Sequence, residues 1–156
     1  MIDATDQALL QEVLRREERS ELMYVREAYP WTAARGHTAL EALQRLIREE
    51  RDALTALGRW MTRRHVPLPY LGVFPTGFTT INFLALDYLL PRLRDRQREA
   101  VAWLERDAHA VTDPEARAQL DVLLALKRRH LATLESLAST GAPPAEPAAS
   151  APAVSH

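Results

Sequence analysis

Four long segments of this chain repeat hydrophobic residues with the period of an α-helix. Between residues 40 and 61 the apolar positions and one glutamate, Glu50, advance in steps of three and four, which puts them on one helical face. Stripes with the same spacing run through about residues 5–29, 81–108 and 112–137. No segment alternates apolar and polar residues in the manner of a β-strand. The pattern therefore predicts an all-α protein.

The first two helices are separated by a very short connection. Pro30 ends the first helix, because proline cannot continue a helix and disfavours a helical residue before it. Thr32 is the expected N-cap of the second helix, although the glycine at position 36 allows a start at Thr38 instead. The second helix should end at about Arg64, since prolines follow it. So short a connection requires the two helices to be antiparallel.

Residues 66–80 form a long connection that is unusually apolar for a loop. An extended chain of this length reaches about 45 Å. A helix of thirty residues at about 1.5 Å per residue has the same length. The connection can therefore cross the whole protein, and the third helix then runs parallel to the second. This predicts an antiparallel four-helix bundle with a long crossover between helices 2 and 3.

The third and fourth helices carry local signals at their ends. Thr79 or Thr80 is the expected cap of the third helix, and Pro91 should either bend it or split it in two. Residues 112–115, Thr-Asp-Pro-Glu, have the order of a capping box and open the fourth helix. We therefore expect one bundle domain over residues 1–138. Residues 139–156 are rich in alanine and proline and should be a disordered tail.

Each of the four stripes contains polar residues that should be buried. Counting residues from the helix ends places one polar residue of each stripe at a common depth, within about 5 Å along the bundle axis, and His130 lies one turn from Lys127 on the same face. Glu21 and Arg94 lie about one turn from this level on their own helices. The residues that should form this core polar cluster are Glu17, Glu50, Gln97, Lys127 and His130.

The helix order, the long crossover and the glutamate pair Glu17 and Glu50 resemble the ferritin-like superfamily, which includes ferritins, rubrerythrins and related di-iron proteins. The resemblance covers about residues 5–137. In that family two helices each supply a Glu and two supply Glu-x-x-His to a di-iron centre. Here Ala53 occupies the histidine position after Glu50, and Lys127 occupies the glutamate position before His130. The resemblance therefore implies the fold together with an incomplete ligand set.

Charge favours a cluster without metal, so no cofactor is expected. Two ferrous ions need about four carboxylates, whereas here Lys127 offsets one of the two glutamates. The alternative is one Fe, Mn or Zn ion held by Glu17, Glu50 and His130, with Glu21 as a further ligand. The first reading predicts a non-catalytic bundle that acts through association. The second predicts a metal-binding oxidoreductase-type protein, so the sequence leaves open whether this is an enzyme.

Composition and charge bear on the number of domains, the binding of nucleic acid or membrane, the location and the assembly of the protein. The 156 residues are 47% hydrophobic and include no cysteine, which fits one domain without disulfides. With 20 basic and 21 acidic residues, no field favours nucleic acid or an anionic membrane. No apolar run is long enough to span a bilayer and no signal region opens the chain, so a cytoplasmic location is expected. The usage of alanine and arginine suggests a bacterial protein. A homodimer is the expected assembly, through the apolar crossover and the tryptophans Trp31, Trp60 and Trp103.

Overall fold

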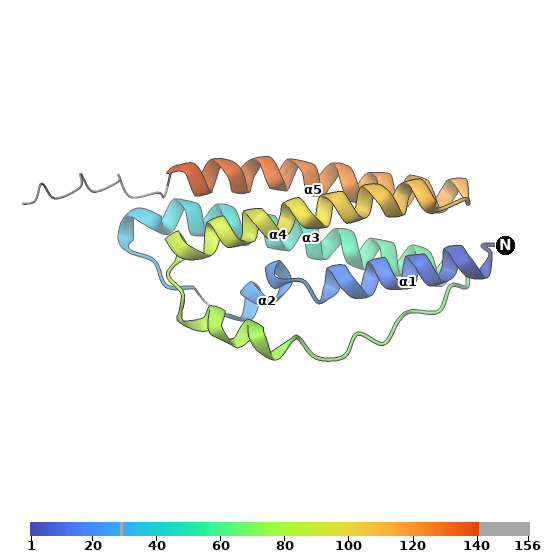
Figure 1. Ribbon diagram of the computed structural model, residues 1–156, viewed down its shortest axis with the longest axis horizontal. Helices are drawn as coiled ribbons and strands as arrows, with labels where there is room; N and C mark the ends of the chain where they lie inside the picture. Colours follow the sequence, from blue (N-terminus) through green and yellow to red (C-terminus); the bar gives the residue numbers. More distant parts are fainter. Residues whose placement is uncertain (29, 141–156) are drawn as a thin grey trace, which may run out of the picture.

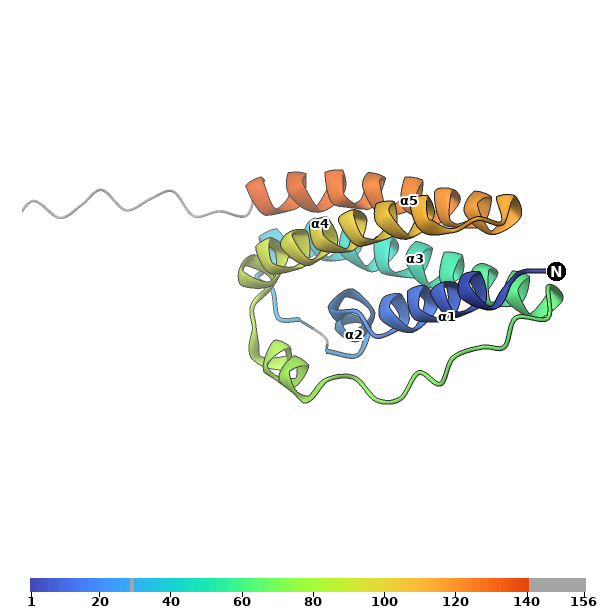
Figure 2. The ribbon, with the colours of Figure 1, turned by 45° about the vertical axis from the view of Figure 1, so that its right-hand side comes forward.

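The computed structural model describes residues 1–28 and 30–140, and this part of the chain is all-helical (Figure 1). Four long helices lie side by side in both views (Figures 1 and 2), and they bury one continuous apolar core. The expectation for Tyr29 and for the tail from residue 141 falls outside the described residues. The elements are α1 Ala4–Glu18, α2 Glu21–Ala28, η1 Ala34–Gly36, α3 His37–Arg63, η2 Thr76–Phe83, α4 Leu86–Ala110 and α5 Pro114–Thr140.

The prediction of one continuous first helix is wrong, because the helix is interrupted at Arg19 and Ser20. The Ser20 N–H bonds back only three residues to the Glu17 carbonyl at 3.2 Å, which tightens and ends α1. The Ser20 hydroxyl then accepts the Met23 N–H at 3.3 Å, and this interaction caps α2. The apolar stripe continues across the break, so periodicity alone does not reveal it.

The start of α3 differs from the expected cap at Thr32. The helix begins at His37, one residue before the alternative start at Thr38, and its N-cap residue is Gly36. A Cβ on Gly36 would lie 1.8 Å from the Thr32 hydroxyl oxygen, so any other residue here would require the Thr32 side chain to move. Thr32 is thus a neighbour of the helix start rather than its cap.

A Schellman motif ends α3 and turns the chain into the long connection. His65 adopts a left-handed conformation with φ 58°, and the Val66 N–H returns to the Met61 carbonyl at 2.9 Å. Met61 and Val66 are both buried, as this motif usually requires. Residues 64–75 then run along the outside of the helices (Figures 1 and 2). Gln11 of α1 fastens this segment, since its amide donates to the Pro67 carbonyl at 2.8 Å.

The third predicted helix begins later than Ile81, because residues 76–83 form the separate 3-10 helix η2. The N-cap residue of α4 is Ala85 rather than Thr79 or Thr80. Its first N–H group, that of Leu86, is satisfied by the Trp31 carbonyl at 2.8 Å. Pro91 lies within α4, and the helix continues through it to Ala110. A helix split at Pro91 is therefore wrong.

The fourth predicted helix is α5, and its cap is one residue from the expected one. Asp113 accepts the Ala116 N–H at 2.8 Å, so Asp113 caps the helix and Pro114 occupies its first position. The Thr112 hydroxyl donates to Asp6 instead, which rules out the capping box. The helix continues to Thr140, so Ser139 and Thr140 belong to α5 rather than to a tail. Across residues 1–28 and 30–140, no helix combines the length and the apolar character needed to cross a bilayer.

Candidate functional site

The structure brings all five residues of the core polar cluster together. They come from α1, α3, α4 and α5, and none of the five is more than 4% exposed. Burial of so many polar groups is tolerated only when each finds a partner. Four of the five carry ionisable side chains: Glu17, Glu50, Lys127 and His130.

Lys127 lies at the centre of the cluster. Its Nζ lies 2.5 Å from Glu17 Oε2 and 3.1 Å from Glu50 Oε2. Burial acts to lower the pKa of Lys127, but the two carboxylates outweigh it and hold this pKa above its ordinary value. The side chain therefore remains an ammonium that bridges α1 and α3 from α5.

Glu50 accepts hydrogen bonds from three directions. Gln97 Nε2 donates to its Oε1 at 2.5 Å and also reaches the Lys127 carbonyl oxygen at 3.3 Å. His130 Nδ1 lies 3.0 Å from the same Oε1. Burial acts to raise the pKa of Glu50, but the Lys127 ammonium and the bonds from His130 and Gln97 outweigh it. The pKa lies below its ordinary value, so Glu50 is a carboxylate at neutral pH.

His130 contacts a carboxylate with each ring nitrogen. Nδ1 faces Glu50, and Nε2 lies 2.8 Å from Glu49 Oε2. An ionised carboxylate only accepts, so both nitrogens must carry hydrogen and the ring is an imidazolium. Burial works against this charge, but both hydrogen bonds raise the pKa of His130, and the bond to His130 lowers the pKa of Glu49. The charges of the four ionic groups in the cluster, two carboxylates and two cations, then sum to zero.

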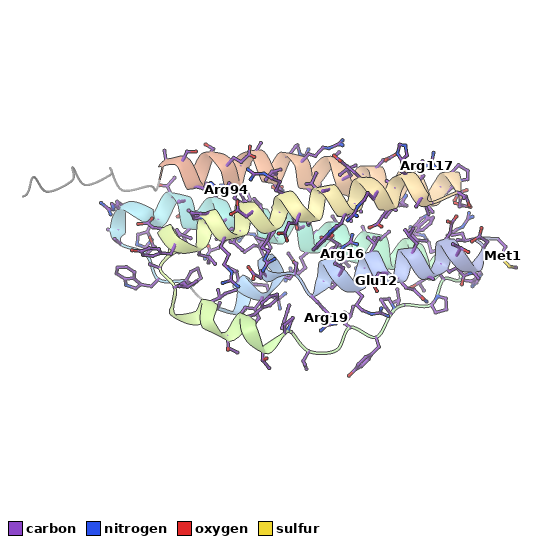
Figure 3. All side chains as sticks on the ribbon, viewed as in Figure 1. Met1, Glu12, Arg16, Arg19, Arg94 and Arg117 are labelled. Carbon is purple, nitrogen blue, oxygen red and sulfur yellow. The ribbon has the colours of Figure 1, made fainter. Side chains whose placement is uncertain are left out.

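The cluster continues toward the surface on the side of α1. Arg16 reaches Glu17 Oε1 at 3.4 Å and Asp107 at 2.8 Å. Its guanidinium lies 5.5 Å from the centre of the Trp103 ring, and Figure 3 shows Arg16 between α1 and α4. Together with Glu49 on the opposite side, the groups form a row of alternating sign across the bundle. In order they are Asp107, Arg16, Glu17, Lys127, Glu50, His130 and Glu49.

Glu21, the further ligand of the metal alternative, contacts other side chains. Its carboxylate forms two hydrogen bonds with the Arg92 guanidinium, at 2.9 and 2.6 Å, and Arg96 lies at 3.5 Å. Within the described residues, no three His, Asp or Glu side chains form a group suited to a metal ion. A divalent ion between Glu17 and Glu50 would have to replace the Lys127 ammonium.

A second buried carboxylate, Asp6, was missed from the sequence. It is 1% exposed and accepts the backbone N–H groups of Thr112 and Asp113, the latter at 2.7 Å. Burial acts to raise the pKa of Asp6, but these N–H groups outweigh it and hold the pKa below its ordinary value. The available signal was its position four residues before Leu10, on the stripe that leads to Glu17.

The carboxylate oxygens of the cluster already have hydrogen-bond partners, and this limits the chemistry that they can perform. All four carboxylate oxygens of Glu17 and Glu50 are engaged, by Lys127, Arg16, His130 and Gln97. Both carboxylates are at most 2% exposed. Comparison with models of known families, with curated proteins and with solved structures finds no match to this chain.

Proposed function

We propose that this protein is a non-catalytic helical bundle in which an ionic cluster occupies the place of a metal centre. In this proposal the long helices form an antiparallel bundle of the ferritin-like type, with residues 64–85 as its crossover. The observation that carries it is the Lys127 ammonium, which lies between the carboxylates of Glu17 and Glu50. A buried cation in that position supplies the charge that a metal would otherwise supply.

Charge balance supports this reading over a redox centre. The buried set is neutral with His130 as an imidazolium, and every carboxylate oxygen in it has a partner. A metal-binding oxidoreductase with Fe or Mn is the second candidate. It is favoured by the burial of Glu17, Glu50 and His130 in one polar cluster, in which Lys127 contacts both carboxylates and His130 contacts Glu50. In that case the Lys127 ammonium must move away from the two carboxylates and His130 must lose a proton. Both changes are unfavourable, because the carboxylates stabilise the charged forms and raise the pKa of Lys127 and of His130.

A bundle without chemistry acts through contact, and the long connection offers the surface for it. Tyr70 and Val73 are 87% and 81% exposed, and Leu68 and Leu71 are also exposed. Hydrogen bonds from Gln11 and Arg15 to the backbone of this segment hold it in place on α1. Apolar side chains gathered on an ordered segment mark an interaction site. We propose that two copies of the chain meet there. Trp60 is buried and takes no part.

The association proposal predicts the mass in solution and how a variant changes it. Sedimentation should give twice the chain mass of 17.6 kDa. Tyr70→Glu with Val73→Glu should weaken dimerisation by at least about tenfold, since each change places a charge in an apolar contact. Val122→Glu is the matched control, because Val122 is 68% exposed on α5, away from this segment. A monomeric wild type, or a dimer that both variants leave equally intact, would overturn the proposal.

A further inference from the structure

A recess between α2 and α3 has the dimensions of a ligand site. Its volume is about 390 Å³, within the range of small-molecule pockets. Its floor is apolar: Val25, Leu43 and Ile47 are buried, and Leu40 packs against the core beside them. The lining is completed by Arg26, Pro30, Gln44, Arg48 and Arg51.

The charged lining of this recess is entirely basic. Three of its nine residues, Arg26, Arg48 and Arg51, are arginines, and none is acidic. The chain as a whole has a net charge of -1, so the sign of the charge on this lining differs from that of the chain. Arg48 is exposed and forms no ion pair with the described part of the chain, while Arg51 reaches only its exposed neighbour Asp52, at 4.0 Å.

One acid outside the lining acts on two of these arginines. Glu18 lines the adjacent recess and lies close enough for Arg26 and Arg51 to act on it electrostatically. Burial raises the pKa of Glu18 above its ordinary value even against these two arginines.

We infer that the recess between α2 and α3 binds a small amphipathic carboxylate, with its apolar chain on the floor and its carboxylate between Arg48 and Arg51. The two arginines are three residues apart on α3, so they lie on one face of the helix. A guanidinium pairs with a carboxylate through two parallel hydrogen bonds, and this selects an anion over a neutral or cationic head group.

The occupant is a single molecule rather than a bilayer. The apolar groups at this place form the floor of a recess, and Val25, Leu43 and Ile47 are at most 3% exposed. A membrane contact needs apolar side chains that project beyond the charged ones, whereas here the arginines stand at the rim. One acyl chain can enter such a recess.

Calorimetric titration of the full chain with monomeric decanoate tests the inference. Saturable binding of one molecule per chain is expected. Arg48→Glu should weaken it at least tenfold, because the variant places a negative charge beside the ligand carboxylate. Arg45→Glu is the matched control, since Arg45 is exposed on the same helix, three residues away and outside the recess, and it should stay within twofold of wild type. Decyltrimethylammonium, which has the same chain and the opposite charge, should not bind.

Several outcomes would overturn the inference. Absence of saturable decanoate binding would do so directly. Equal effects of Arg48→Glu and Arg45→Glu would show that the contact is general electrostatics. Equal affinity for the cationic analogue would show that the arginines play no part. Binding to phosphatidylglycerol vesicles without binding to decanoate would make this a membrane surface.

Discussion

Replacing Lys127 by alanine should destabilise the protein by about 3–5 kcal/mol, the usual effect of removing one partner from a buried ion pair. The change leaves the carboxylates of Glu17 and Glu50 buried without the ammonium that bridges them. It also leaves a cavity where a fully enclosed side chain was. A loss of this size is a large part of the stability of a domain, so the variant should be barely folded at 37 °C. Chemical denaturation measures it.

Two further variants separate charge from packing. Lys127→Met keeps most of the volume, so it should be more stable than Lys127→Ala by the contribution of the cavity. In both variants a buried carboxyl group should have a folded-state pKa above its unfolded value. The destabilisation should therefore be smaller at pH 5 than at pH 8, because protonation removes the unpaired charge. Arg128→Ala, the exposed neighbour, is the control and should change stability by less than about 0.5 kcal/mol. A Lys127→Ala variant as stable as this control would contradict the account.

Asp6→Ala should destabilise the protein by about 3 kcal/mol, since it removes a charged acceptor and leaves two backbone N–H groups unpaired. The Asp6 carboxylate joins the first turn of α1 to the connection between α4 and α5, through the N–H groups of Thr112 and Asp113. The Thr112 hydroxyl adds a further bond at 2.9 Å. Urea denaturation of the variant beside wild type gives the difference.

The effect of Asp6 should depend on pH in a defined direction. Its folded-state pKa is lowered from the ordinary value of 3.8. A lowered pKa contributes stability that is present above pH 3.8 and is lost as the pH falls through the folded-state value. Asp6→Asn keeps the shape without the charge, so its difference from wild type should shrink below pH 3.8. A difference that is constant with pH would show that the charge of Asp6 contributes nothing.

Helical periodicity was enough to predict the main helices and the members of the core polar cluster. Residues such as Glu50 and Lys127 stand at stripe positions, and equal depth along the helices is sufficient to bring them together. The break at Ser20 could not be predicted in this way, because it depends on a local hydrogen bond that leaves the stripe intact. The N-cap of α5 could not be predicted from the stripe either. Thr112 and Asp113 are both good capping residues, and the contact of Thr112 with Asp6 decides between them.

The contacts of Arg16 and Glu49, which extend the row of alternating charge beyond the cluster, could not be predicted from the apolar stripes. Arg16 and Glu49 each precede a cluster residue by one position, so they project about 100° away from it on the helix. Whether such a side chain meets the next helix depends on the rotation of both helices about their axes. That rotation is set by the packing of the whole core, including the buried apolar residues around the cluster. A single stripe does not contain this information.

The metal content of the protein, purified without chelators from cells grown with iron and manganese, tests the central claim most directly. The account predicts far less than one metal ion per chain, because the Lys127 ammonium already neutralises the carboxylates of Glu17 and Glu50. One or two Fe or Mn ions per chain, lost on His130→Ala but kept in the surface control Arg128→Ala, would contradict it.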